Sequence, residues 1–359
     1  MPSRPASARR SGKPGRAHPP RGHVLITGGG GYIGSILTEL LLTRGYAVTI
    51  LDRWFFGDTV ADLRADSRLR LVREDVRSCR KQHFLGVDAV FDLAALSNDP
   101  AGELDPEKTI AINYQGRARV CRLARAAGVR RYILASSCSI YGFQDDVVDE
   151  TSPINPLTTY ARANGLAEEA ALKLAGARFT VTALRQATVY GLSRRMRFDL
   201  AINGMTLSVF KQGAVKILRD GTQWRPMVHV RDTSRAFIAV LEADPGVVNG
   251  EIFNVGSDDQ NLQILPLARR VSAAVGVPFR EDWYGDPDHR SYQVSFKKFA
   301  QRLGYRTEHT PEDGAREIFQ ALTTGETTDG PTTRTVDWYK NLAHWHGVLK
   351  EIVLRDAVL

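Results

Sequence analysis

The sequence predicts an α/β fold, namely a doubly wound parallel sheet followed by a smaller, interleaved α/β lobe. Short apolar runs alternate with amphipathic stretches of helical spacing through the first half of the chain, which is typical of parallel strands joined by helices. A glycine-rich segment joins the first apolar run to the first helix. The 359 residues allow a core domain with a smaller companion, because domains usually contain ~100–200 residues.

Six short runs rich in Val, Ile and Leu form the predicted sheet. They cover residues 23–27, 47–51, 69–72, 89–93, 132–135 and 179–184. Stretches of helical spacing lie between several of them, at residues 32–43, 106–127 and 158–175. Strands that are apolar at every position are buried on both faces, so we expect helices on both sides of the sheet.

The alternation becomes irregular after about residue 190. Short strands are expected at 215–218 and 251–254, and helices at 231–242, 264–275, 295–303 and 311–322. No linker rich in Pro, Gly and Ser separates this part, so it is predicted to be interleaved with the first. The last stretch has apolar residues at helical spacing and is expected to pack on the body. The predicted organisation is a basic tail 1–22, a sheet domain 23–190 to which later segments return, a lobe 191–335 and a helical extension 336–359.

The positive charge of the chain is concentrated at its N-terminus. The formal net charge is +8, but residues 1–22 contain six basic and no acidic residues, so the rest carries only +2. A segment of this kind, rich in Pro, Gly, Ser and Ala, is predicted to be disordered. A solvated leader is favoured over a nucleic-acid-binding arm, which stays open as the alternative.

Composition also narrows the class of protein. No run approaches the ~18 consecutive apolar residues of a transmembrane helix, and the basic N-terminus lacks the apolar core of a secretory signal. Cys79, Cys121 and Cys138 show neither a disulfide framework nor zinc spacing. We therefore expect a cytoplasmic protein with no membrane partner and no metal site.

The glycine-rich segment is the first sign of a ligand. Thr27-Gly28-Gly29-Gly30-Gly31-Tyr32-Ile33-Gly34 leads from a strand into a helix. At this spacing Gly28 permits a tight turn, Gly31 lets the backbone approach a pyrophosphate, and Gly34 lets the helix pack on the strand. The N–H groups and the dipole of the helix favour phosphates. The segment predicts a dinucleotide site with Gly28, Gly31, Tyr32, Ile33 and Gly34, rather than a merely flexible turn.

An acidic residue follows at the end of the second strand. Asp52 lies 18 residues after Gly34, where a carboxylate would bind both ribose hydroxyls and repel a 2′-phosphate. This favours NAD over NADP. Arg53 beside it weakens that preference, because a guanidinium would attract the phosphate.

Four later motifs make the prediction specific. They are Ser-Ser-Cys-Ser-Ile-Tyr-Gly at 136–142, Tyr-Ala-Arg-Ala-Asn at 160–164, Leu-Arg-Gln-Ala-Thr-Val-Tyr-Gly at 184–191 and Trp-Arg-Pro-Met-Val-His-Val-Arg-Asp at 224–232. Their order and spacing resemble the extended short-chain dehydrogenase/reductases, in particular the NAD-dependent nucleotide-sugar epimerase/dehydratase family. The resemblance covers roughly residues 23–305 and implies a Rossmann-type sheet domain with a lobe that clamps a nucleotide-diphosphate sugar.

The resemblance also implies a role for individual residues. Tyr160 would be the catalytic base, Ser137 would hydrogen-bond the reacting hydroxyl, and position 164 would hold the nicotinamide ribose. The further residues that would contact NAD are Asp75, Val76, Leu93, Ala94, Ala95, Asn113 and Gln186. The further residues that would contact the sugar nucleotide are Ser97, Cys138, Ser139, Thr188, Asn203, Arg225 and Arg290.

The chemistry of the reaction supports these residue types. Removal of a hydride from a carbinol carbon leaves a proton on its oxygen, which a base must accept. A free tyrosine has a pKa of ~10, so it needs nearby positive charge to act at neutral pH. Planar, permanently charged guanidinium groups suit a diphosphate.

The sequence departs from the family pattern at one catalytic position. The family motif is Tyr-x-x-x-Lys, and Asn164 stands where the lysine is expected. Residues i and i+4 share a helix face, so Asn164 can keep the ribose contact but contributes no charge. Three hypotheses follow: a working enzyme with another source of charge, a weakened NAD-binding relative, and a nucleic-acid-associated protein that uses the tail.

The positions after Ser137 bear on the type of reaction. The family's 4,6-dehydratases have Asp-Glu there, and this chain has Cys138 and Ser139, neither of which is a good acid at pH 7. The sequence therefore predicts an NAD-dependent nucleotide-sugar epimerase, with a reductase or other oxidoreductase, a dehydratase, or a weakened relative as alternatives. The helices at 106–127 and 158–175 suit a homodimer interface. His229 is predicted to be a structural core residue.

Overall fold

The computed structural model describes residues 20–286 and 290–353. The predictions for residues 1–19, which make up most of the basic tail, lie outside the described residues. The same holds for the end of the C-terminal extension, from residue 354 onward.

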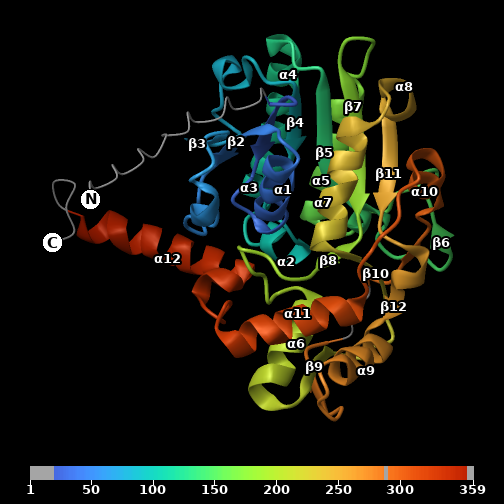
Figure 1. Cartoon of the computed structure of the whole chain (residues 1–359). Coiled ribbons are helices and arrows are strands. Elements are labelled where there is room, and N and C mark those ends of the chain that lie inside the picture. Colours follow the sequence, from blue (N-terminus) through green and yellow to red (C-terminus); the bar gives the residue numbers. More distant parts are fainter. Residues whose placement is uncertain (1–19, 287–289, 354–359) are drawn as a thin grey trace, which may run out of the picture.

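A sheet of seven parallel strands lies at the centre of the molecule (Figure 1). Its spatial order is β11-β7-β5-β4-β1-β2-β3, so the direction of winding reverses between β1 and β4. The strands are β1 (His23–Thr27), β2 (Ala47–Asp52), β3 (Leu69–Arg73), β4 (Ala89–Asp92), β5 (Arg131–Ser137), β7 (Thr180–Gln186) and β11 (Glu251–Val255). The predicted α/β class and all six predicted strands of the sheet are confirmed.

The seventh strand corrects one expectation. Residues 251–254 were predicted as a strand of the lobe. In the structure β11 instead pairs in parallel with β7, from Glu251 beside Thr182 to Val255 beside Gln186. It therefore extends the main sheet by one edge strand. A single short apolar run carries no information about its pairing partner, because that partner is distant in the sequence.

Helices cover both faces of this sheet. On one face α1 (Tyr32–Thr43) packs against α7 (Val230–Glu242), and on the other α4 (Arg117–Ala127) packs against α5 (Thr159–Leu172). The predicted helix 106–127 consists of α3 (Pro106–Ile110), a π-helical turn (Ala111–Gly116) and α4. A shorter helix, α2 (Asp99–Gly102), precedes it.

The two cores follow the two-residue period of the strands. Val24 and Ile26 of β1 lie in the core with α1 and α7, while Leu25 between them lies in the core with α4 and α5. All three side chains are fully buried. Because both faces of each strand are covered, nearly every position is apolar, and the strands are visible in the sequence as continuous apolar runs.

A buried ion pair fixes α5 to β7. Glu168 and Arg185 are almost completely buried, and Arg185 Nη2 lies 2.8 Å from Glu168 Oε2. The Arg185 Nε also donates to Glu168 Oε1 at 3.0 Å. The two parallel contacts hold α5, which carries Tyr160 and Asn164, in one orientation against the sheet.

The lobe lies beyond the carboxyl ends of the main strands (Figure 1). Its core is shared by α6 (Ala201–Gln212), α9 (Ile264–Ala274) and α11 (Pro311–Thr324). Three small sheets complete it. The first consists of β8 (Thr188–Tyr190), β10 (Trp224–His229) and β12 (Asn261–Gln263). The second pairs β9 (Val215–Leu218) with β13 (Glu281–Tyr284), and the third pairs β6 (Val147–Val148) with β14 (Gln293–Val294). The remaining short helices are α8 (Pro245–Val248) and α10 (Lys297–Leu303), with 3-10 turns at Ala61–Leu63, Lys81–Phe84, Cys138–Tyr141, Asp258–Gln260 and Pro331–Thr333.

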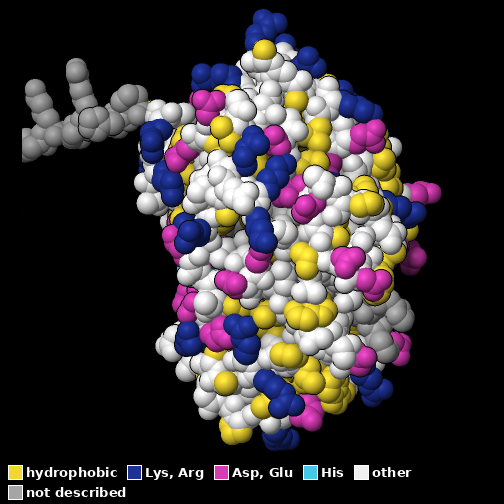
Figure 2. All heavy atoms as spheres, turned by 90° about the vertical axis from the view of Figure 1, so that its right-hand side faces the viewer, with side chains coloured by type: hydrophobic (Ala, Val, Ile, Leu, Met, Phe, Trp, Pro, Cys, Tyr) yellow, Lys and Arg dark blue, Asp and Glu magenta, His cyan; other side chains and the backbone are white. Residues whose placement is uncertain are grey.

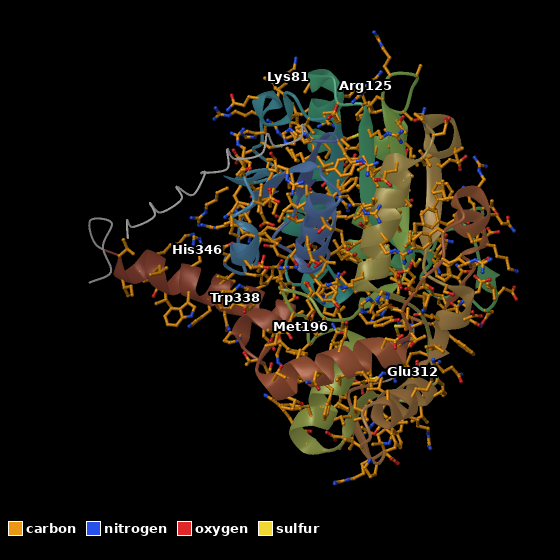
Figure 3. All side chains as sticks on the ribbon, viewed as in Figure 1. Lys81, Arg125, Met196, Glu312, Trp338 and His346 are labelled. Atoms are coloured by element: carbon orange, nitrogen blue, oxygen red, sulfur yellow. The ribbon has the colours of Figure 1, made fainter. Side chains whose placement is uncertain are left out.

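The C-terminal helix α12 (Thr335–Ile352) projects away from the body (Figure 1). Figure 3 shows Trp338 near the body and His346 on the outer part of the helix. Trp338 Nε1 donates to the backbone oxygen of Phe55 at 2.6 Å, whereas Trp345 is 57% exposed. The expectation that this stretch packs on the body is therefore wrong for its outer half, because helical spacing of apolar residues does not specify what they contact.

Charges of both signs are interspersed on the face seen in Figure 2. Apolar side chains occur there in small groups between them. Mixed charge of this kind gives no broad positive field on this face. Among the described residues, no helix has the length and the apolar character needed to cross a membrane.

Candidate active site

A cleft of about 400 Å³ lies at the carboxyl edge of the main sheet, where the lobe closes over it. Ligands of doubly wound sheets bind at this edge, near the reversal of strand order. Most of the predicted site residues line the cleft. They are Gly28, Gly31, Tyr32, Ile33, Gly34, Asp52, Arg53, Asp75, Val76, Leu93, Ala94, Ala95, Ser97, Ser137, Ser139, Tyr160, Asn164, Gln186, Thr188, Arg225 and Arg290.

Three predicted site residues are not among the residues that line the cleft. Asn113 accepts a hydrogen bond from Leu96 N at 2.8 Å and donates one to Leu96 O at 3.0 Å. The thiol of Cys138 is buried and donates to the backbone oxygen of Arg185. In the structure the side chains of Asn113 and Cys138 make supporting contacts within the protein, and their predicted ligand contacts stay predictions.

Asn203 is the third of these residues. Its side chain is fully buried, accepts from Gly191 N at 3.0 Å and donates to Arg197 O at 2.8 Å. A buried amide with these partners holds the loop between β8 and α6 in place. It therefore positions Arg197, which does line the cleft.

The glycine-rich turn forms a cradle that has no room for side chains. Gly28 has a positive φ of 70°, and a Cβ there would lie 2.9 Å from the backbone of Ala94. A Cβ on Gly34 would lie 2.5 Å from Gly28 O. The N-terminus of α1 has no side-chain cap, so its N–H groups are available to an anion. The cradle fits the pyrophosphate of a dinucleotide.

We expect Gly34→Ala to weaken dinucleotide binding. The added methyl group forces the turn and α1 apart, and overpacking typically costs ~1–3 kcal/mol. NAD affinity, measured by quenching of tryptophan fluorescence, should fall by about tenfold or more. Gly347→Ala is the matched control, because a Cβ there meets nothing within 4 Å. Equal affinity of the two variants would contradict the cradle.

Asp52 ends β2 at the wall of the cleft. Its Oδ2 accepts from Gly30 N at 2.9 Å and its Oδ1 from Trp54 N at 2.7 Å. Burial raises the pKa of this carboxyl group above its usual value, and the backbone hydrogen bonds oppose that rise. The backbone thus holds both carboxylate oxygens at the position where a dinucleotide places its ribose.

Arg53 forms an ion pair with a neighbouring acid. Arg53 Nη1 lies 2.6 Å from Asp75 Oδ2, and Arg77 pairs with the same carboxylate at 2.7 Å. Burial would raise the pKa of Asp75, but the hydrogen bonds from Arg77 and Arg53 outweigh it and lower the pKa. Arg53 is therefore oriented toward Asp75, which removes the sequence argument for a 2′-phosphate.

Ser137 and Tyr160 line the cleft from neighbouring elements. Ser137 ends β5, and Tyr160 lies in the first turn of α5, whose N-cap Thr158 accepts from Ala161 N at 3.1 Å. Burial, and next the charge of Asp99, raise the pKa of Tyr160. Hydrogen bonding by Ser137 and the positive charge of Arg117 act in the opposite direction.

Several arginines gather in the cleft. Arg290 Nη1 lies 2.5 Å from Asp99 Oδ2, and Arg197 Nη2 lies 2.7 Å from Asp199 Oδ2. Arg195 stacks on Phe56 at 3.6 Å, its Nε is buried without a hydrogen-bond partner, and burial lowers its pKa to about 10. This concentration of guanidinium groups suits a ligand with phosphate groups.

Sequence reasoning missed several residues of the cleft wall. They include Asp99, Arg117, Arg195, Arg197, Tyr292 and Tyr339. The run Arg194-Arg195-Met196-Arg197 after β8 was a usable signal, because it follows the carboxyl end of a strand at the ligand-binding edge. Tyr339 comes from α12, and no sequence pattern indicates that this helix reaches the cleft.

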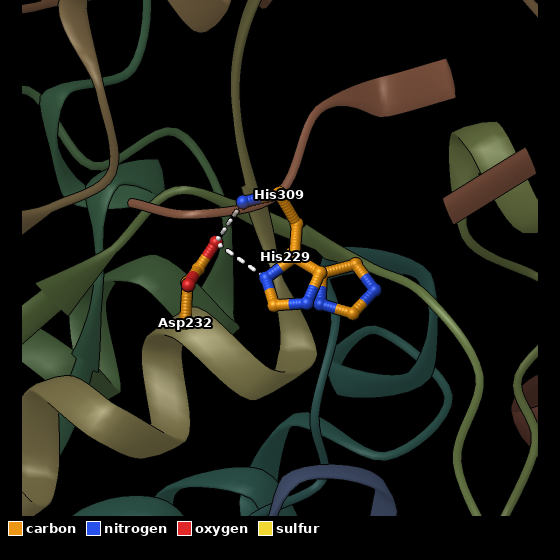
Figure 4. Close-up of side chains that lie close together, drawn as sticks. All are labelled: His229, Asp232 and His309. Atoms are coloured by element: carbon orange, nitrogen blue, oxygen red, sulfur yellow. Dashed lines mark hydrogen bonds and ion pairs between the residues drawn. The ribbon is translucent and has the colours of Figure 1, made fainter. Parts of the chain in front are cut away.

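A second cluster of titratable side chains lies where β10 leads into α7, beside the segment that precedes α11. Figure 4 shows His229, Asp232 and His309 together. The two imidazole rings are stacked with centroids 4.2 Å apart and an interplanar angle of 14°. A metal binds in the plane of an imidazole along the nitrogen lone pair, and two stacked rings do not direct their lone pairs to one point.

The contacts of this cluster are those of a structural unit. His229 is fully buried, caps α7 through Arg231 N, and its Nε2 lies 2.7 Å from Glu317 Oε1. Asp232 accepts from the backbone of Glu308 and His309 and pairs with His309 Nδ1 at 3.2 Å. The cluster joins α7 of the main domain to α11 and the segment before it, in agreement with the structural role predicted for His229.

We expect this pair to make stability depend on pH. The hydrogen bond to Asp232 raises the pKa of His309 above 6.5, so the contribution of His309 is full below that value and is lost as pH rises through the raised pKa. Burial would raise the pKa of Asp232, but hydrogen bonds lower it below 3.8, so its contribution is lost as pH falls. The pair is most stabilising between pH 3.8 and 6.5.

Urea unfolding of the His309→Gln variant tests this expectation. The loss of unfolding free energy relative to the native protein should be larger at about pH 5.5 than at about pH 8.5. His346→Gln is the matched control, because His346 is exposed on α12. A loss of equal size at both values would show that the charge of His309 does not matter.

Comparison with known proteins identifies the family of this chain. The model of the NAD dependent epimerase/dehydratase family matches residues 24–256. A UDP-glucose 4-epimerase of Corynebacterium glutamicum is 29% identical over 310 residues, which cover 80% of this chain and 91% of that protein. A UDP-N-acetyl-alpha-D-glucosaminuronate decarboxylase of Bacillus cytotoxicus is 27% identical over 314 residues, which cover 82% and 96%.

A solved structure of similar fold supports the same assignment. The structure of MoeE5 in complex with UDP-glucuronic acid and NAD superposes with a TM-score of 0.76 at 27% identity, over 85% of this chain and 100% of that chain. The relatives include an epimerase and a decarboxylase. This chain belongs to the NAD-dependent epimerase/dehydratase family, and its cofactor is NAD.

Proposed function

We propose that this protein is an NAD-dependent epimerase that inverts a carbinol carbon of a UDP-sugar. The observation that carries the proposal is the wall of the cleft at Ser137. The residues that follow are Cys138, a thiol buried in the core, and Ser139, a hydroxyl. Epimerisation needs only a base and a hydrogen bond at the reacting oxygen, and Ser137 with Tyr160 supply both.

The residues around the cleft fit the cofactor and the base. The segment from Gly28 to Gly34 would hold the pyrophosphate, and Asp52 the ribose hydroxyls. When bound, NAD supplies an acceptor for a hydride from the sugar carbon and returns the hydride afterwards. Tyr160 accepts the proton of the sugar hydroxyl at its phenolic oxygen and gives it back, while Ser137 orients that hydroxyl by a hydrogen bond.

The diphosphate of the substrate would lie at the basic part of the cleft. Arg225 and Arg290 both line it, and the side chain of Arg225 holds the backbone of Arg290, since Arg225 Nη1 donates to Arg290 O. Guanidinium groups bind phosphate oxygens in a planar, two-pronged manner. The uridine specificity rests on the names of the relatives and of the ligand of MoeE5.

Dehydration fits the site less well. Loss of water needs an acid beside the leaving hydroxyl, and burial raises the pKa of Cys138 far above its usual value. A thiol in this state cannot exchange a proton with a sugar. Decarboxylation of a UDP-hexuronic acid has no leaving hydroxyl to protonate, and a proton is returned to the ring carbon only after CO₂ is lost. It is therefore the main competitor in the test.

The first measurement is the identity of what the purified protein holds. Denaturation followed by mass spectrometry should release NAD in a stoichiometric amount, as a cofactor that is regenerated in each cycle requires. The protein is then incubated with UDP-glucose and with UDP-glucuronic acid. A product of unchanged mass and inverted configuration supports the proposal, and loss of CO₂ from UDP-glucuronic acid identifies a decarboxylase.

Two other outcomes would decide against epimerisation. Build-up of NADH with a keto-sugar identifies an oxidoreductase. Retained NAD with no turnover of either sugar identifies a weakened relative. Tyr160→Phe is the control for every arm, because it removes the base and leaves the cleft otherwise unchanged.

We also propose that two copies of the chain pair through α4 and α5. Leu166 on α5 is 39% exposed, although it is a large apolar side chain. An isologous pair would cover it with the same face of the second copy. Light scattering should give twice the mass of the chain, and Leu166→Glu should reduce it to that of one copy.

A further inference from the structure

We infer that Arg117 supplies the positive charge beside Tyr160 that the family motif obtains from a lysine at position 164. Arg117 lies in α4, at the wall of the cleft, and Asn164 lies in α5. The inference deepens the proposed function, since it rests on the role of Tyr160 as the base. It resolves the question that the sequence left open, namely where the missing charge comes from.

The geometry joins Arg117 directly to the substituted position. Arg117 Nη1 donates to Asn164 Oδ1 at 2.8 Å, and Asn164 Nδ2 donates to the backbone oxygen of Tyr160 at 3.1 Å. Arg117 Nη2 donates to the backbone oxygens of Asp92 and Ala135, at the carboxyl ends of β4 and β5. Three elements of the fold, α5, β4 and β5, therefore hold the guanidinium group beside Asn164.

Arg117 is buried to an extent that is rare for a cation. Its side chain is 1% exposed, and its Nε is buried without a hydrogen-bond partner. A buried charge that lacks full pairing is costly, so an arginine is an unfavourable choice here for stability alone. A functional constraint at the site explains it.

The acid nearest to Arg117 forms a long ion pair with its Nε, whereas Nη1 donates to Asn164. Asp92 Oδ1 lies 4.0 Å from Arg117 Nε, and the carboxylate accepts hydrogen bonds from Thr27 Oγ1 and from Tyr132 OH. Burial raises the pKa of Asp92. The guanidinium group thus keeps a positive field toward α5, where Tyr160 and Asn164 lie.

Other charged side chains also act on Tyr160. Asp99 of α2 raises the pKa of Tyr160 and Arg117 lowers it. Arg197 interacts electrostatically with Tyr160 but pairs with Asp199 at 2.7 Å. Asp99 in turn pairs with Arg290 at 2.5 Å. Of these cations, Arg117 is the one hydrogen-bonded to the residue that replaces the lysine.

The π-helical turn before α4 explains how the arginine reaches this place. The turn Ala111–Gly116 widens the helix just before Arg117, and such turns occur frequently at functional sites. Asn113 within the turn holds the loop after β4. Asn113 and Arg117, four residues apart, therefore point to the same edge of the sheet.

The exchange at position 164 is coupled to Arg117. A lysine at 164 would bring a second cation against the guanidinium group, in place of the present contact of 2.8 Å. An asparagine accepts from Arg117 and donates to α5 without adding charge. The arginine and the asparagine therefore act as one unit.

The test is a titration of Tyr160 that needs no substrate. Ultraviolet absorbance of the NAD-loaded protein is recorded from about pH 6 up to the highest pH at which circular dichroism shows it folded, and the same curve of the Tyr160→Phe variant is subtracted. Arg117→Gln should raise the pKa of Tyr160 by about one unit or more, which means tenfold less phenolate at neutral pH. Arg119→Gln, on the same helix, is the matched control and should leave the pKa unchanged.

Two further variants keep the inference falsifiable if Arg117→Gln folds poorly. Arg117→Lys retains the charge and should keep the pKa near that of the native protein. The double variant Arg117→Gln with Asn164→Lys should restore it, whereas Asn164→Lys alone should reduce turnover of UDP-glucose. With UDP-glucose as substrate, the alkaline shift should reappear in the pH profile of kcat/KM.

Two results would overturn the inference. One is an unchanged pKa of Tyr160 in folded Arg117→Gln. The other is a double variant that behaves like Arg117→Gln alone. Because the titration uses no sugar, a shift without turnover of any UDP-sugar would leave the inference standing and remove the proposed function. Turnover without a shift would do the reverse.

Discussion

Tyr160→Phe should lower the turnover of a UDP-sugar by about 10²–10⁴-fold, the usual contribution of a positioned acid–base group. The phenyl ring fills the same space, so neither the position of α5 nor the cleft should change. Gly102 packs closely against the Cβ of Tyr160, and this contact is kept in the variant. Initial rates with UDP-glucose and UDP-glucuronic acid measure the effect, with NAD content as the control for an intact site.

The result also locates the base. If the variant retains activity within a few-fold of the native protein, the proton goes to another group, and Asp99 becomes the group to replace next. Asp99 accepts from Thr158 Oγ1 at 2.6 Å and pairs with Arg290, so it is already held in the cleft. A loss of NAD in the variant would instead indicate a disturbed cofactor site.

Glu168→Ala should lower the free energy of unfolding by about 3–5 kcal/mol, because it leaves the guanidinium group of Arg185 buried without its partner. The two side chains are 3% and 5% exposed, so water cannot replace the carboxylate. Urea unfolding followed by circular dichroism measures the change. Activity should fall with it, since α5 carries Tyr160.

The same helix provides a matched control. Glu169 pairs with Lys173 at 2.5 Å, but the two side chains are 61% and 70% exposed. An exposed pair of this kind contributes about 0.5 kcal/mol or less, so Glu169→Ala should be nearly neutral. Equal losses in the two variants would mean that the negative charge of α5, and not the buried pair, is what stabilises the helix.

The sequence was sufficient for the features that depend on local chemistry. Each strand of the main sheet except β11 was assigned to it, because burial on both faces makes a strand apolar along its length. The glycine cradle was visible because only residues without a Cβ fit between the turn and α1. Ser137 and Tyr160 were predicted to share one site because they occupy set positions of the family motif, and both line the cleft.

The tertiary structure decided what depends on distant partners. β11 joined the main sheet because β7 was its available edge. The first turns of α12 are held at the body by Tyr339, which packs on Phe55 and Phe56, while the outer part of the helix projects (Figure 1). Asn203 was assigned to the substrate, yet its amide completes the hydrogen bonds of a buried loop. In each case the deciding contact joins residues that no local sequence pattern links to one another.

Arg117 and Asn164 show most clearly which features the sequence determined and which the tertiary structure decided. The sequence by itself determined that the cation of the motif is missing at position 164, since a motif is a local pattern. It could not determine that a guanidinium group 47 residues away lies 2.8 Å from that asparagine, because electrostatic interactions depend on distance in space. Only the packing of α4 beside α5 brings the charge and the base to the same cleft.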